Sequence, residues 1–428
     1  MGNKKYVVVL GDGMADEPIE ALGGKTPLEY ADTPAMDRLS KRAEMGMVQT
    51  IPEGMKPGSD TANLSVLGYD PIVYYSGRSP LEALSIGVPM KDTDVALRCN
   101  IVTLSEEDVP FEERIIIDHS SGEISTQDCA VLLEAVKAEL ANETYQFYVG
   151  TSYRHCLIWN QGQVIELCPP HDVLGQVIGQ YLPEDENLLR MMKRSYDILA
   201  GHPINIERKK KGLNPANCCW FWGAGTKPAL SSFQEKNGLK AVMVSAVDLL
   251  KGIAVGAGMG VAKVEGANGG LHTNYEGKVQ AALDALRRDC DFAYIHVEAP
   301  DEMGHQGSVE KKVQAIEFLD KRVIGPLTEA LDREGTAYRL LVMPDHPTPV
   351  RVRTHTADSV PYLLYDSGKP EDKDGKNCCN EIEKCAEDSG RLTQTLSPHY
   401  NEREAGETGI FISQGHTMID RLLEKEGK

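Results

Sequence analysis

The chain has 428 residues, of which 41% are hydrophobic and 25% charged, and its formal net charge is −19. So acidic a chain excludes sequence-independent binding to nucleic acid or to anionic membranes as its function. It has no apolar run of about 18 residues, and its ten cysteines show no CxxC spacing. We therefore expect a cytoplasmic protein with reduced thiols and with neither a nucleic-acid nor a membrane partner.

The first elements indicate an α/β domain. Residues 6–10 (YVVVL) predict a central strand, which runs directly into the acidic loop at 11–13 (GDG). Residues 35–43 have helical spacing after a Thr-Pro helix-start signal. The loop at 56–60 leads into a further predicted helix at 61–67.

The middle of the chain differs in texture and lacks Asp or His at its strand ends. It predicts mixed strands and helices at 95–104, 127–140, 145–149, 155–159 and 186–199. We interpret residues 77–236 as an inserted α+β domain that interrupts a discontinuous metal-binding domain of residues 1–76 and 237–428.

The last part returns to strand and helix alternation. Strands are predicted at 241–244, 261–264, 292–297, 339–343 and 360–365, with helices at 275–288, 309–331 and 418–423. The alternation predicts an α/β core with a mainly parallel sheet and helices on both faces. Residues 366–407 hold eleven acidic and six basic residues, and we expect them to form a surface excursion.

Carboxylates and imidazoles follow three of these strands. They are Asp12, Asp301 with His305, Asp345 with His346, and His355 nearby. Taken singly, each has a structural explanation, such as turn formation by Asp or a helix-surface Asp–His pair. Because the ends of parallel strands converge at one edge of a sheet, their joint occurrence favours a metal site. This donor mixture suits Mn²⁺ or Zn²⁺ better than Ca²⁺.

Ser59 has two interpretations, and the segment alone favours neither of them. At a helix start it can be an ordinary N-cap. Beside a divalent cation, its hydroxyl can instead become a nucleophile toward phosphorus, with helix N–H groups facing the phosphoryl oxygens.

Five motifs in order along the chain carry a resemblance. They are residues 11–13 (GDG), 58–63 (GSDTAN), 76–82 (SGRSPLE), 298–305 (EAPDEMGH) and 344–349 (PDHPTP). Together they resemble the archaeal-type, cofactor-independent phosphoglycerate mutases of the alkaline phosphatase superfamily. The resemblance extends over nearly the whole chain.

This resemblance implies an isomerase of glycolysis and gluconeogenesis that interconverts 3-phosphoglycerate and 2-phosphoglycerate through a phosphoserine intermediate. It implies two divalent metal ions, with Mn²⁺ preferred and Mg²⁺, Zn²⁺ or Co²⁺ as alternatives, and no bisphosphoglycerate. One ion would be held by Asp12, Ser59, Asp345 and His346, and the other by Asp301, His305 and His355. Ser59 matches the phosphorylated nucleophile. The inserted domain would hold the substrate, a small phosphorylated hydroxy acid, and a homo-oligomer is left open.

Several residues of the inserted domain are candidates for substrate binding. Arginines clamp carboxylate or phosphate groups and histidines move protons, so we single out Arg78, Arg98, Arg154, His119, His155, His171 and Asp172. The alternative is that each arginine pairs with a neighbouring acid and each histidine is structural. Residues 214–223 contain two tryptophans, and we favour a core plug there over a wall of the substrate cleft.

Three other functions stay open at this point. Some bacterial relatives of the family have been proposed to phosphorylate homoserine, and a homoserine kinase-like phosphotransferase would use the same site. A metal-dependent phosphatase would need a site open to water, against which the inserted domain argues. A non-catalytic scaffold would not need every expected position to be filled.

Overall fold

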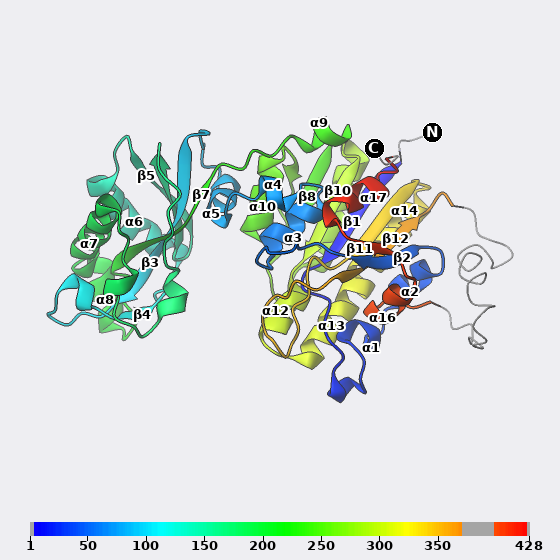
Figure 1. Cartoon of the computed structure of the whole chain (residues 1–428), viewed down its shortest axis with the longest axis horizontal. Helices are drawn as coiled ribbons and strands as arrows, with labels where there is room; N and C mark the ends of the chain where they lie inside the picture. The colour runs from blue at the N-terminus through cyan, green and yellow to red at the C-terminus, as the bar shows by residue number, and fades with distance from the viewer. Residues whose placement is uncertain (1–3, 370–397, 426–428) are drawn as a thin grey trace. The chain divides into compact units, whose positions relative to one another are not determined.

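A computed structural model describes residues 4–369 and 398–425, so most of the predicted excursion at 366–407 lies outside the described residues. The chain divides into two compact units (Figure 1). The first comprises residues 1–75 and 230–428, and the second comprises residues 76–229. Within the described residues, no helix is both long enough and apolar enough to cross a bilayer.

The first unit is built on an eight-stranded sheet in the order β13-β2-β12-β11-β1-β10-β8-β9 (Figure 1). Its strands are β1 (Lys5–Gly11), β2 (Glu44–Val48), β8 (Ala241–Val244), β9 (Gly260–Val261), β10 (Phe292–Val297), β11 (Tyr338–Met343), β12 (Val360–Asp366) and β13 (Phe411–Ile412). Strand β1 pairs in parallel with both β10 and β11, whereas β12 runs antiparallel to its two neighbours. The loops that follow β1, β10 and β11 therefore open at the same edge of the sheet.

Helices cover both faces of this sheet. They are α1 (Pro27–Tyr30), α2 (Pro34–Ser40), α3 (Ser59–Val66), α4 (Pro71–Tyr74), α9 (Phe233–Asn237), α10 (Asp248–Gly256), α11 (Tyr275–Arg288), α12 (Ala299–His305), α13 (Val309–Leu319), α14 (Gly325–Arg333), α16 (Glu402–Glu407) and α17 (Met418–Leu422). Val7 and Val9 of β1 pack in one buried core with apolar side chains of α11, α13 and α14. Helices α10 and α17 contact β8 and β11. The predicted α/β class is confirmed.

Two predicted elements of this unit differ in detail, and one strand was not predicted. The strand predicted at 261–264 is only the two-residue β9. The helix predicted at 309–331 is interrupted by a π-helical turn at Asp320–Ile324, between α13 and α14. Strand β2 was not predicted, because its sequence EMGMV lacks a β-branched run; it pairs between β12 and β13.

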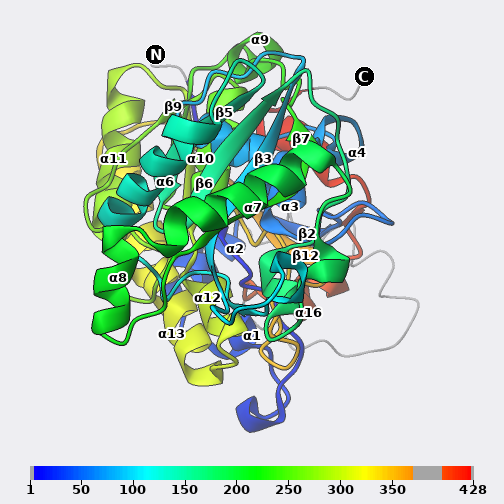
Figure 2. The same cartoon turned by 90° about the vertical axis from the view of Figure 1, so that its left-hand side faces the viewer.

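The second unit is an antiparallel sheet covered by helices. Its strands are β3 (Asp94–Leu104), β4 (Ile116–Asp118), β5 (Tyr145–Thr151), β6 (Arg154–Asn160) and β7 (Cys218–Thr226), and its helices are α5 (Arg78–Ser85), α6 (Thr126–Leu140), α7 (Glu186–Ala200) and α8 (Pro203–Lys210). Strand β3 pairs with β4, β6 and β7. Helices α6 and α7 lie over the strands, as Figure 2 shows, and enclose a separate core. The predicted α+β character is confirmed.

Candidate active site

Gly13 is the point where three loops of the first unit meet. Its φ is +58°, and a Cβ atom there would lie 2.5 Å from Thr348 Oγ1 and 2.6 Å from Asp301 Oδ1. Its backbone N–H donates to Asp345 Oδ1 over 3.1 Å. Only glycine fits this position, and it lets the loop carrying Asp12 approach the loops that follow β10 and β11.

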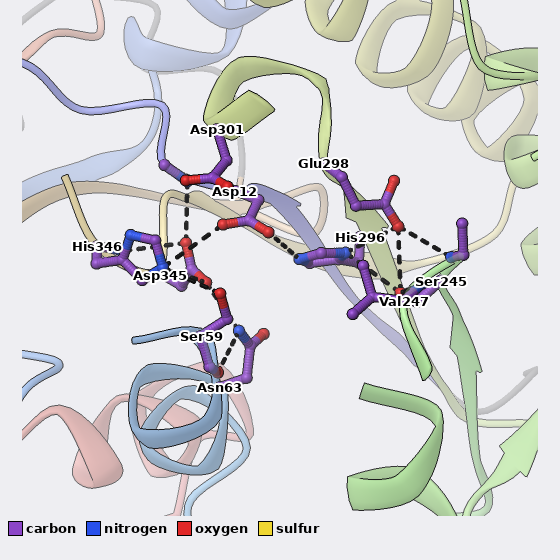
Figure 3. A network of polar contacts seen from close by, with 12 residues as sticks. Asp12, Ser59, Asn63, Ser245, Val247, His296, Glu298, Asp301, Asp345 and His346 are labelled. Carbon is purple, nitrogen blue, oxygen red and sulfur yellow. Dashed lines mark hydrogen bonds and ion pairs between the residues drawn. The ribbon is translucent and has the colours of Figure 1, made fainter. Parts of the chain in front are cut away.

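A first group of donors lies at this sheet edge. One ligand atom each of Asp12, Asp345 and His346 lies within 4.8 Å of the others, and all three residues are buried (Figure 3). Asp345 is held from α3, because Asn63 Nδ2 donates to its Oδ2 over 2.8 Å. Ser59 Oγ lies 3.1 Å from His346 Nε2.

A second group adjoins the first. Asp301, His346 and His355 also place ligand atoms within 4.8 Å of one another. His305 Nε2 lies 3.2 Å from Asp301 Oδ2 and 3.1 Å from His355 Nε2. The structure thus brings the seven predicted ligands together. Since His346 belongs to both groups, the division of ligands between two ions stays a prediction.

Ser59 is the first residue of α3, and Gly58 occupies the N-cap position. In the described part of the chain, no side-chain cap bond is made at this helix start. The interpretation of Ser59 as an ordinary N-cap is therefore wrong. Its hydroxyl is placed instead against the imidazole of His346.

The titration of these groups is strongly perturbed. Burial, together with the charges of Asp345 and Asp301, raises the pKa of Asp12 well above its usual value. Burial opposes ionisation of Asp301, but hydrogen bonds from His305 and His355 outweigh it and hold the pKa well below normal. Burial lowers the pKa of His346, which favours its neutral, ligating form.

The donor set fits divalent metal ions. Three carboxylates crowd together, and the buried Oδ1 of Asp12 has no hydrogen-bond partner among the described residues. Buried carboxylate oxygens are rarely left without a partner, and cations relieve the repulsion between neighbouring carboxylates. Neutral imidazoles and carboxylates would together hold ions of the Mn²⁺ or Zn²⁺ type.

Behind Asp12 lies an ionic group that the sequence analysis missed. His296 of β10 contacts both Asp12 and Glu298, and Glu298 pairs with Lys278 of α11. Burial disfavours the charged form of His296, but the two carboxylates outweigh it and raise its pKa to about 10. The position of Lys278 on a predicted helix did not indicate this ionic group, because only the fold shows that the lysine is buried.

Most of the predicted substrate-binding residues gather in the second unit. The Arg98 guanidinium pairs with Glu82 and lies 4.5 Å from the ring centroid of Trp222, its cross-strand partner on β7. Arg78 Nε donates to Glu82 over 3.0 Å. Both arginines therefore pair with a neighbouring acid, which was the alternative to substrate binding. The acid is the same for both, so one carboxylate is shared between two cations.

Aromatic rings extend this cluster. His171 packs edge-on against Trp222 and His119, with ring centroids 5.3 and 6.2 Å apart. His119 packs against Tyr153, over which Arg154 lies. Asp172 Oδ1 lies 3.5 Å from His171 Nε2. Six of the seven predicted substrate residues thus form one cluster, which we call the arginine–histidine cluster: Arg78, Arg98, Arg154, His119, His171 and Asp172, with Glu82, Tyr153 and Trp222 as additions.

The predictions for His155 and for the two tryptophans of residues 214–223 have different outcomes. His155 is buried, its Nε2 lies 3.0 Å from Cys129 Sγ, and burial lowers its pKa to about 4. This placement favours a structural role over the predicted substrate contact. Trp220 is buried and donates to the Cys168 carbonyl, as a core plug would, whereas Trp222 lies in the arginine–histidine cluster.

Several known proteins resemble this chain in sequence. A family model described as 2,3-bisphosphoglycerate-independent phosphoglycerate mutase matches residues 40–205. A probable 2,3-bisphosphoglycerate-independent phosphoglycerate mutase of Geobacter sulfurreducens is 44% identical over 426 residues, covering 98% of this chain and 100% of the relative. The 2,3-bisphosphoglycerate-independent phosphoglycerate mutase of Methanosarcina barkeri is 48% identical, covering 85% and 91%.

Two solved structures match over almost the full length. The PH0037 protein from Pyrococcus horikoshii has a TM-score of 0.77 and 28% identity, covering 99% of this chain and 98% of its own. The cofactor-independent phosphoglycerate mutase from Thermoplasma acidophilum has a TM-score of 0.62 and 25% identity, covering 99% and 100%. This chain belongs to the family of 2,3-bisphosphoglycerate-independent phosphoglycerate mutases.

Proposed function

We propose that this enzyme interconverts 3-phosphoglycerate and 2-phosphoglycerate in glycolysis and gluconeogenesis, in the cytoplasm and without bisphosphoglycerate. The observation that carries the proposal is the Ser59 hydroxyl, which lies 3.1 Å from His346 beside the buried carboxylates of Asp12 and Asp345. Relatives named as such mutases are 44% and 48% identical over 98% and 85% of this chain, which supports the same reaction.

Ser59 is the proposed phosphoryl carrier. The Ser59 hydroxyl loses its proton as Oγ forms a bond to the phosphorus of the bound phosphoglycerate. The bond between phosphorus and the glycerate oxygen breaks, and this oxygen takes up a proton to become a hydroxyl. The second glycerate hydroxyl then takes the phosphoryl group from Ser59, which regenerates the serine. Two divalent ions, for which we propose Mn²⁺, would lower the pKa of the serine hydroxyl and neutralise charge on the phosphoryl group.

The proposed ligands of these ions are the residues of the two donor groups. Asp12, Ser59, Asp345 and His346 would hold one ion, and Asp301, His305 and His355 the other. The segments that follow β1, β10 and β11 carry all of these side chains except Ser59, which lies on α3. Thr348 Oγ1 donates to Asp301 Oδ1 over 2.5 Å.

We assign the substrate's carboxylate to the arginine–histidine cluster of the second unit. Arg98 and Arg78 share Glu82, so the cluster keeps net positive charge that a carboxylate would neutralise. Holding the glycerate by this end allows it to turn without leaving, which separates a mutase from a phosphatase. His119 and His171 are the proposed groups for moving the glycerate proton.

The test is a product analysis by phosphorus NMR. Metal-loaded enzyme is incubated with Mn²⁺ and 3-phosphoglycerate, without bisphosphoglycerate, and in parallel with homoserine and a phosphoryl donor. We expect 2-phosphoglycerate to reach equilibrium in the first reaction. Inorganic phosphate as the only product would instead identify a phosphatase, and phosphohomoserine in the second reaction a homoserine kinase-like enzyme.

A further inference from the structure

Four buried ionisable side chains follow one another behind the candidate active site. Lys278 Nζ lies 2.5 Å from Glu298 Oε2. Glu298 Oε1 lies 3.2 Å from His296 Nδ1, and His296 Nε2 lies 3.1 Å from Asp12 Oδ2 (Figure 3). None of the four side chains is more than 6% exposed. We call Lys278, Glu298 and His296 the buried ionic chain.

Neighbouring groups orient Glu298 and Lys278, which form the end of the buried ionic chain away from Asp12. Glu298 Oε1 accepts a hydrogen bond from the Ala246 backbone N–H over 2.9 Å and lies 3.3 Å from Ser245 Oγ. The ammonium of Lys278 also donates to the His296 carbonyl over 2.7 Å. Both oxygens of Glu298 are thus engaged, so its carboxylate holds one orientation toward His296.

The imidazole of His296 has a carboxylate oxygen beside each ring nitrogen. Nδ1 is hydrogen-bonded to Glu298 Oε1, whereas Nε2 makes no hydrogen bond to any described residue and meets Asp12 Oδ2 at ion-pair distance. The imidazole therefore lies directly against Asp12 Oδ2. The other oxygen, Oδ1, lies 3.6 Å from His346 Nε2 and makes no hydrogen bond to any described residue.

A contribution to folding stability does not explain well why the buried ionic chain is present. Buried ion pairs are often no more stabilising than apolar side chains of similar volume, because each charge loses its hydration. The chain ends on a proposed metal ligand, and groups behind a ligand commonly set its orientation and basicity.

We propose that the buried ionic chain is a positioning device, in which His296 occupies Asp12 Oδ2 so that Asp12 binds metal through Oδ1 alone. The inference rests on the metal binding of the proposed function, but not on the reaction catalysed. Asp12 bound through one oxygen would leave room for a phosphoryl or serine oxygen to bind the same ion.

Two substitutions at one position separate positioning from packing. The amide nitrogen of glutamine reaches about as far as Nε2 of histidine, so His296→Gln keeps a donor toward Asp12. The amide nitrogen of asparagine reaches only as far as Nδ1, so His296→Asn keeps the side facing Glu298 but frees Asp12 Oδ2.

The primary readout is Mn²⁺ binding to metal-free protein, titrated by calorimetry without substrate. We expect His296→Asn to weaken one of the two binding steps by roughly 10- to 100-fold. The weakened step must be the one that Asp12→Asn removes, and His296→Gln must restore most of the affinity. In the Co²⁺-loaded protein, His296→Asn should also lower the visible absorption, because a second Asp12 oxygen raises the coordination number.

Control variants distinguish a folding defect from a loss of Asp12 positioning. Tyr338→Phe removes a partly buried hydrogen bond to Asp332 at the opposite end of β11, and should leave both binding steps unchanged. The double variant Lys278→Met with Glu298→Gln removes two charges together, and should weaken the same step as His296→Asn. Wild-type Mn²⁺ affinity and Co²⁺ absorption in His296→Asn, or in the double variant, would overturn the proposal. Normal metal binding without mutase turnover would instead refute the proposed function alone.

Discussion

Position 13 requires glycine for two reasons, which are its left-handed backbone and the lack of room for a Cβ atom. The effect of each on stability can be measured separately. Gly23 has a similar φ of +69°, but a Cβ atom there would meet nothing within 4 Å. Gly23→Ala should therefore cost about 1 kcal/mol of unfolding free energy, which is the cost of the left-handed backbone alone. Gly13→Ala should cost a further 1–3 kcal/mol or so, because Thr348 and Asp301 must move.

Urea unfolding of the metal-free protein, followed by circular dichroism, measures both variants. We also expect Gly13→Ala to lower Mn²⁺ affinity, since the displaced Asp301 is a proposed ligand, whereas Gly23→Ala should not. Equal destabilisation by the two substitutions would contradict the close contact at Gly13.

The imidazoles of His305 and His355 give a prediction about metal content. Each contacts Asp301, and we assign both to the same ion. His305→Ala or His355→Ala should therefore lower the bound metal by about one ion per chain after dialysis, whereas Ser59→Ala should keep both ions but lose phosphoryl transfer. Elemental analysis measures this, with His399→Ala, whose imidazole pairs with Asp37, as the control. Two ions retained by both histidine variants would show that our assignment is wrong.

Among the elements, helix α2 depends on a carboxylate from the π-helical turn. Asp320 is fully buried, and its two oxygens accept the backbone N–H groups of Ala35 and Met36 over 3.0 and 2.7 Å. Burial raises its pKa from 3.8 to about 6. The folded state thus binds this proton more tightly than the unfolded chain does. The resulting stability is present below pH 4 and is lost as the pH rises through 6.

Asp320→Asn removes this titration. Wild-type stability should fall relative to the variant by up to about 3 kcal/mol between pH 4 and pH 7. Urea unfolding followed by far-ultraviolet circular dichroism is the suitable probe, because all three tryptophans, at 159, 220 and 222, lie in the second unit. A difference between the two proteins that does not change with pH would contradict the shifted pKa of Asp320.

The elements that could be predicted from sequence are those with local signals. Strands β1, β10 and β11 have apolar runs followed by Asp or His, so both the strands and the donor groups at their ends were predictable. Strand β2 was not, because its pairing depends on distant partners. A Cβ atom at Gly46 would lie 2.8 Å from the carbonyl oxygen of Ile410, which sequence spacing cannot show. The burial of Lys278 likewise follows from its contact with Glu298 in the folded chain.

At the scale of the whole molecule, the proposal divides the work between the two units. The first unit carries Ser59 and the metal ligands, and the second carries the arginine–histidine cluster that holds the glycerate. Arg98→Met should therefore lower kcat/KM for 3-phosphoglycerate by roughly 10- to 100-fold, the usual effect of losing a charged hydrogen bond. It should also release more inorganic phosphate per 2-phosphoglycerate formed, because the glycerate escapes before the phosphoryl group returns.

Arg194→Met is the matched control, since Arg194 pairs with Glu139 outside the cluster. Both products are measured in one coupled assay. An unchanged product ratio and KM in Arg98→Met would remove the arginine–histidine cluster from the proposal.

The central claim is that Ser59 carries the phosphoryl group between the two hydroxyls of glycerate. Rapid acid quenching of the Mn²⁺-loaded enzyme during turnover of 3-phosphoglycerate, followed by peptide mass spectrometry, tests it most directly. We predict a phosphoryl group on Ser59 that forms within the first turnover, and neither this group nor 2-phosphoglycerate in Ser59→Ala. Turnover to 2-phosphoglycerate by Ser59→Ala, or a phosphoryl group on another residue, would contradict the account.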